Sequence, residues 1–147
     1  MADRLSKIWI ERNISMWDSH PLISNVLNIV YTRNSGAAFG ILHDAPDWVR
    51  MLVLIGVSSL VLGIILWMIW KETQGRFALA LLAGGALGNL FDRIFYGSVT
   101  DFIQVFIGSY EWPSFNIADS AISIGAVLIA LDMFRKRTPS PHASQTH

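Results

Sequence analysis

Two aspartates near long apolar segments are the first candidates for chemistry. Asp119 lies near the start of an apolar stretch at residues 115–134, and Asn116 precedes it by three residues. In a helix these two side chains share one face. An ionisable group at membrane depth is costly to bury and is by default a functional candidate. The alternative is an interfacial aspartate that favours a helix N-terminus, and the sequence leaves both interpretations open.

Asp101 gains interest only through Asp119. It lies in the segment GSVTDFI, and by itself it is typical of a solvated loop residue. Two carboxylates from different segments can share a proton, because like charges a few ångströms apart do not both ionise easily. One would then act as a general base towards water and the other as a general acid towards a leaving amine. Whether the two side chains meet depends on the fold.

A second polar pair lies at the end of another apolar stretch. Asn89 and Arg93 are four residues apart and share one helix face. They are either a packing amide and an arginine that extends to the interface, or a polar wall that binds a substrate backbone or headgroup. We expect Asp92 to pair or cap locally, and Asp132 to form a local ion pair near the basic residues that follow it.

Other chemistries find less support. His20, His43, His142 and His147 form no tight ligand spacing, so we predict no metal site. Ser6 and Lys7 are adjacent, and adjacent helical residues point in different directions, which gives no support for a Ser/Lys dyad. The chain has no cysteine, which excludes disulfides and thiolate sites. Its formal net charge is zero, so nothing favours nucleic acid as a partner.

Long apolar segments must position these side chains. Hydrophobic residues make up 52% of the 147-residue chain and charged residues only 15%, well below the usual quarter of a soluble domain. Residues 51–70 contain no charge, and residues 77–94 and 115–134 are also strongly apolar. Because about 20 apolar residues cross a bilayer as a helix, we predict three transmembrane helices.

The basic residues suggest how the helices are oriented. KETQGR joins the first two helices and RKR follows the third, so both lie on one side, which we expect to be cytoplasmic. Residues 1–50 and 95–114 then lie outside, and residues 138–147 form a disordered cytoplasmic tail. Residues 26–32 are β-branched and aromatic and predict a strand. The segment RNSGAAFG follows as a turn, and we expect residues 102–107 at the membrane surface. The fold class is therefore a mainly α membrane bundle with a small extracytoplasmic β-rich region.

Four short blocks, taken together and in order, resemble the lipoprotein signal peptidase family, also called signal peptidase II. The first is DRLSK at residues 3–7, and the second is RNSGAAFG at residues 33–40. The third is GNLFDR at residues 88–93, followed by VTDF at residues 99–102, and the fourth is FNIAD at residues 115–119. The resemblance extends from about residue 3 to residue 134, and it implies that residues 1–137 form a single membrane-embedded peptidase domain.

The resemblance implies a catalytic role for Asp101 and Asp119 as an aspartyl dyad. It also implies substrate-positioning residues at Asn34, Asn89, Arg93 and Asn116, and supporting residues at Asp3 and Lys7. The implied reaction removes the signal peptide from a diacylglyceryl-modified prolipoprotein, just before the lipid-bearing cysteine. No metal or organic cofactor is implied. We expect a monomer in the bacterial cytoplasmic (inner) membrane, in contact with membrane lipids, with its active site at the outer face.

One departure from the family pattern and two other functions remain to be weighed. The family has four transmembrane helices, whereas only three are visible here, so we expect about 10–15 residues of an upstream half-helix to be missing, given the ~20 needed to span. A transporter or channel subunit could use Asp101 and Asp119 as a relay, with carboxylates spread across the membrane depth. A non-catalytic assembly protein could instead associate through Gly84 and Gly88.

Overall fold

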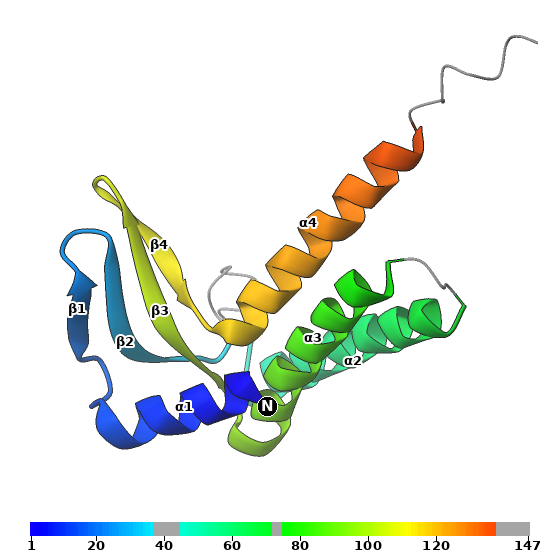
Figure 1. Ribbon diagram of the computed structural model, residues 1–147. Coiled ribbons are helices and arrows are strands. Elements are labelled where there is room, and N and C mark those ends of the chain that lie inside the picture. Colours follow the sequence, from blue (N-terminus) through cyan, green and yellow to red (C-terminus); the bar gives the residue numbers. More distant parts are fainter. Residues whose placement is uncertain (37–44, 72–74, 138–147) are drawn as a thin grey trace, which may run out of the picture.

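The computed structural model describes residues 1–36, 45–71 and 75–137 (Figure 1). Within these ranges the chain forms one short helix, α1 (Ala2–Asn13), and three long helices, α2 (Asp47–Lys71), α3 (Arg76–Tyr96) and α4 (Ile117–Arg137). The strands are β1 (Ser19–Ile23), β2 (Leu27–Asn34), β3 (Val99–Ile107) and β4 (Tyr110–Phe115). The sheet stands on one side of the molecule and the long helices on the other, and α1 runs below the sheet towards them (Figure 1).

Among the described residues, three helices are long and apolar enough to cross a membrane, and they are α2, α3 and α4. Only 6% of the most apolar part of α2 is buried inside the protein. A helix that is apolar all round and unburied needs lipid around it. The expectation of three helices that are long and apolar enough to cross a membrane is thereby confirmed. Each begins within four residues of its expected start, and α4 begins two residues late because Asn116 caps it.

Helices α3 and α4 approach closely through two glycines. A Cβ atom at Gly85 would collide with the backbone oxygen of Ala118, and one at Gly125 would lie 2.7 Å from the backbone oxygen of Ala78. Small residues allow such approach in lipid. A Cβ at Gly84, in contrast, would meet nothing within 4 Å, and one at Gly88 would lie 3.1 Å from Asp3 Oδ2 and 3.5 Å from Ala118 Cβ.

The sheet is antiparallel with the strand order β1-β2-β3-β4. Its inner strands β2 and β3 pair Thr32 with Asp101, after a bulge in the register that follows Ile29. Strand β2 confirms the predicted strand, shifted by one or two residues. Residues 102–107 belong to β3 and pair on both sides, so this stretch is part of a sheet; its position relative to a membrane surface stays a prediction.

The helix α1 packs against the sheet through a small core. Ile10 of α1, Tyr31 of β2 and Phe102 of β3 are buried together, with Ile14 and Ile103 at the margin. This core holds α1 against β2 and β3, the two strands that carry Asn34 and Asp101. The RNSGAAFG turn falls partly on residues 37–40, the KETQGR loop partly on residues 72–74, and the tail on residues 138–147, all outside the described residues.

Candidate active site

The start of α4 holds Asn116 and Asp119 in a reciprocal cap. The backbone N–H of Asp119 donates to Asn116 Oδ1 at 3.0 Å, and the backbone N–H of Asn116 donates to Asp119 Oδ2 at 3.3 Å. This is the geometry of a capping box, in which two residues three apart satisfy free N–H groups at a helix start. The two interpretations of Asp119 are therefore compatible, because the helix cap also fixes where its carboxylate points.

Asp101 lies on β3, directly beside this cap, and is 2% exposed. Asn116 Nδ2 donates to its Oδ1 at 2.7 Å, and Asn34 Nδ2 donates to its Oδ2 at 3.1 Å. A buried carboxylate is stable only when hydrogen bonds or opposite charges compensate it. Both oxygens of Asp101 are thus bound by amides from different parts of the chain, Asn116 at the cap of α4 and Asn34 on β2.

Asn89 on α3 joins the two carboxylates from the other side. Its Nδ2 donates to Asp119 Oδ1 at 2.7 Å, and its Oδ1 accepts from Asn116 Nδ2 at 3.3 Å. The resulting chain of hydrogen bonds runs from Asp101 through Asn116 and Asn89 to Asp119. Four elements, β2, β3, α3 and the first turn of α4, therefore meet at one polar cluster.

The surroundings of Asp101 favour its protonated form. Burial, the largest cause, and the negative charge of Asp119 raise its pKa, the amide of Asn34 lowers it, and the net result is a pKa raised to about 6. The amide of Asn116 and the charge of Lys7 also lower the pKa of Asp101. A carboxyl that retains a proton near neutral pH beside a second carboxylate can exchange protons with a substrate.

Lys7 lies in a second polar cluster that adjoins the first. Its Nζ lies 2.7 Å from Asp3 Oδ2 and 2.6 Å from Asp92 Oδ2, and the side chain is fully buried. Asp3 Oδ1 also accepts the backbone N–H of Ala118 at 2.9 Å, in the first turn of α4. The expectation that Asp92 pairs locally was wrong, since its partners Lys7 and Arg4 both lie on α1.

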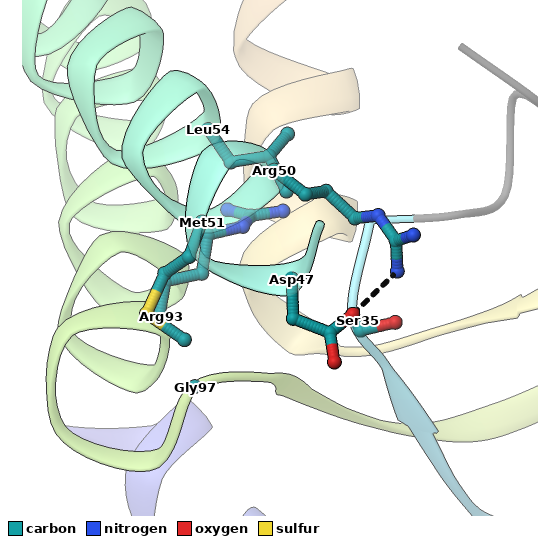
Figure 2. Close-up of a pocket in the computed structure, with 7 residues that line it drawn as sticks. All are labelled: Ser35, Asp47, Arg50, Met51, Leu54, Arg93 and Gly97. Carbon is teal, nitrogen blue, oxygen red and sulfur yellow. Dashed lines mark ion pairs between the residues drawn. The ribbon is translucent and has the colours of Figure 1, made fainter. Parts of the chain in front are cut away.

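A cavity of about 270 Å³ lies between α2, α3 and the end of β2 (Figure 2). Figure 2 shows Arg93 of α3 and Arg50 of α2 on its wall, with Arg50 paired to Asp47 at 3.4 Å. Arg93 lies within electrostatic range of Asp119 and Asp101. Its Nε is buried and donates to no atom of the described residues. Arg93 is therefore a cation that lines the cavity and also lies near the carboxylate pair.

The structure brings nearly all the sequence candidates together. Asp101, Asp119, Asn34, Asn89 and Asn116 share one hydrogen-bonded network, Lys7 and Asp3 join it through Asn89 and α4, and Arg93 lies beside it. Their roles in a reaction stay predictions. Sequence reasoning missed Glu11 and Thr100, whose side chains form a 2.7 Å hydrogen bond that ties α1 to β3 next to Asp101.

Comparisons with known proteins agree over nearly the whole chain. The sequence model of a family described as "Signal peptidase (SPase) II" matches residues 1–135. A lipoprotein signal peptidase of Syntrophus aciditrophicus is 42% identical over 141 residues, which cover 93% of this chain and 88% of that protein. Another from Shewanella oneidensis is 44% identical and covers 91% of this chain and 80% of that protein. A solved structure described as a bacterial membrane enzyme matches with a TM-score of 0.84 at 33% identity, covering 99% of this chain and 88% of that chain.

Proposed function

We propose, from the membership of this chain in the signal peptidase II family, that it removes signal peptides from lipid-modified prolipoproteins by aspartyl catalysis. The family and the three membrane-capable helices also make it a multi-pass membrane protein. The observation that carries the proposal is the hydrogen-bonded link from Asp101 through Asn116 and Asn89 to Asp119. Two carboxylates held at one place by amides suit general acid and general base catalysis on one water.

The proposed reaction needs one proton on the carboxylate pair. The ionised carboxylate takes a proton from water, whose oxygen attacks the carbonyl carbon of the scissile peptide bond. The protonated carboxyl then gives its proton to the departing amide nitrogen as the C–N bond breaks. The products are a signal peptide with a new carboxyl end and a lipoprotein with a free amino group on its lipidated cysteine.

The amides position the two carboxylates, and Arg93 helps to position the substrate. Asn34 and Asn116 hold Asp101, and Asn89 holds Asp119, so each carboxylate reaches the water in a fixed orientation. Arg93 adds a half-buried cation on the wall of the cavity, where it can bind backbone carbonyls of the substrate. A substrate held in the membrane by acyl chains and an apolar helix is presented already localised, which raises its effective concentration.

The proposed location follows from the charges that flank the helices. Lys71 and Arg76 lie at one end of α2 and α3, and Arg135 lies at the same end of α4. If these basic ends are cytoplasmic, the site at the opposite end of α3 and α4 faces outward from the bacterial inner membrane. One chain supplies both carboxylates, so the proposed catalytic unit is a monomer.

The test is a cleavage assay on a diacylglyceryl-modified prolipoprotein in proteoliposomes. The unmodified protein should release the signal peptide, and mass spectrometry should place the cut immediately before the lipidated cysteine. Asp101→Asn should abolish release, because the amide keeps the shape of the side chain but exchanges no proton. The matched control is Asp132→Asn, at the far end of α4, which should cleave normally. Cleavage by Asp101→Asn at the unmodified rate would refute the proposed mechanism.

A further inference from the structure

The side chain of Lys7 is fully buried, yet it touches the network of the carboxylate pair. Besides its ion pairs with Asp3 and Asp92, its Nζ donates to Asn89 Oδ1 at 3.2 Å. A buried ammonium group is costly unless it is paired and hydrogen-bonded. The carboxylates of Asp3 and Asp92 compensate its charge, and the amide oxygen of Asn89 accepts a hydrogen bond from it.

The contact with Lys7 decides which way the amide of Asn89 faces. An ammonium group only donates, so the atom of Asn89 that faces Lys7 must be the amide oxygen. That oxygen also accepts from Asn116, and the NH₂ group is then directed at Asp119, 2.7 Å away. The reversed amide would place its NH₂ against Lys7 and its oxygen against the Asp119 carboxylate, two repulsive contacts at once.

We propose that Lys7 is a positioning residue for the proposed peptidase reaction, which acts through Asn89 to hold the Asp119 carboxylate in its working orientation. The proposal rests on the function proposed above. Among the described residues, Lys7 contacts Asn89 directly and Asp119 through the amide of Asn89, so its effect on the Asp119 carboxylate is indirect. The ion pair of Lys7 with Asp92 joins α1 to α3, and its partner Asp3 accepts the backbone N–H of Ala118 on α4, so α1, α3 and α4 meet at this point.

Lys7 also acts on Asp101 through its charge. The charged groups that face Asp101 are Asp119 on α4, Arg93 on α3 and Lys7 on α1. The positive charge of Lys7 favours the ionised form and lowers the pKa of Asp101. Removing that charge should therefore raise this pKa, so the pair would keep its shared proton to higher pH. A lysine that only stabilised the fold would leave the pH profile unchanged.

The experiment compares variants of Lys7 by cleavage of a lipidated prolipoprotein across a range of pH. Lys7→Met removes both the donor and the charge, and it should lower kcat by about 10–100-fold, as loss of an outer partner of a catalytic group does. The falling limb of kcat/KM should shift to higher pH. Lys7→Gln keeps a donor without the charge, so it should retain more of kcat and still show the shifted limb.

Two further variants separate positioning from simple charge balance. Lys7→Met leaves Asp92 buried without its nearest cation, which can unfold the protein. The double variant Lys7→Met/Asp92→Asn removes this uncompensated charge as well. It should fold, yet keep the low kcat and the falling limb at higher pH. The control is Arg4→Met, which removes the 3.5 Å pair with Asp92 but no contact to Asn89. It should lower thermal stability while leaving kcat and the pH profile unchanged.

The outcomes distinguish this inference from the proposed function. If the unmodified protein cleaves and Asp101→Asn does not, the function stands, and the Lys7 variants decide the positioning role alone. Recovery of normal kcat and of the normal pH limb in the double variant would overturn the inference, because Lys7 would then only balance Asp92. If the unmodified protein released no signal peptide, the proposed function would be rejected, and the inference with it.

Discussion

Asn116 and Asp119 fix each other at the first turn of α4, each accepting the backbone N–H of the other at 3.0 and 3.3 Å. The side chain of Asn116 has a second task, since its Nδ2 donates to Asp101 at 2.7 Å. One asparagine thus serves as the helix cap and as the link between two carboxylates. The helix start and the candidate site are the same structure.

Replacing Asn116 should separate these two tasks. Asn116→Ser keeps a good capping group but is too short to reach Asp101, whereas Asn116→Ala loses both. We expect both variants to lose most of the cleavage rate. Only Asn116→Ala should also lose about 0.5–2 kcal/mol of stability from the missing cap. Thermal unfolding in detergent, run beside the cleavage assay, measures both quantities. Equal cleavage by Asn116→Ser and the unmodified protein would show that the bond to Asp101 is dispensable.

Asp119 and Asn34 should differ in how completely their loss affects cleavage. Asp119→Asn removes a group that exchanges protons, and cleavage should become undetectable. Asn34→Ala removes one of two amides that hold Asp101, so a partial loss of roughly 10–100-fold is expected. Initial rates on the same lipidated prolipoprotein give the comparison. A larger loss in Asn34→Ala than in Asp119→Asn would reverse the assigned roles.

The pH dependence of cleavage should reflect the proton on Asp101. The pKa of Asp101 is raised to about 6, mainly by burial and also by the negative charge of Asp119. Above this pH the pair loses its shared proton, so kcat/KM should fall as pH rises through about 6. A bound substrate excludes more water and favours the neutral carboxyl, so the falling limb of kcat should lie at higher pH than that of kcat/KM. Rates measured from pH 4 to pH 9 test this order. It would be contradicted if the falling limb of kcat lay at the same pH as that of kcat/KM, or at lower pH.

The sequence could predict the residues of the site but only part of their arrangement. Asp119 and Asn116 stood out because polar groups in an apolar segment are costly, and their spacing of three residues already matches a capping box. The pair of Lys7 and Asp92 could not be predicted in this way, because 85 residues separate the two and only the packing of α1 on α3 joins them. Periodicity reports which face a residue occupies, not which distant element covers it.

The sheet shows a similar limit. Strand β2 carries β-branched residues and was predicted, whereas β4 carries Pro113 and polar residues and was not. Proline is tolerated on an edge strand, where one side makes no ladder, and β4 is an edge of this sheet. The strand forms because β3 supplies its pairing partners, a long-range effect that local sequence preferences do not contain.

The close approach of α3 and α4 gives the last prediction, because it sets the position of Asp119. A Cβ at Gly85 would collide with the backbone oxygen of Ala118, the residue just before Asp119, and would lie 2.7 Å from Ile122 Cγ1. Gly85→Ala should therefore push the start of α4 away from Asn89, weaken the 2.7 Å bond between Asn89 and Asp119, and lower both the cleavage rate and the melting temperature.

The matched control is Gly84→Ala, since a Cβ there meets nothing within 4 Å. Alanine is favoured over glycine in a helix by roughly 1 kcal/mol, so this variant should melt at the same temperature or slightly higher and cleave normally. Both variants add one methyl group to adjacent residues of one helix, and only their facing partners differ. A loss of activity in Gly84→Ala equal to that in Gly85→Ala would show that helix packing at Gly85 does not position Asp119.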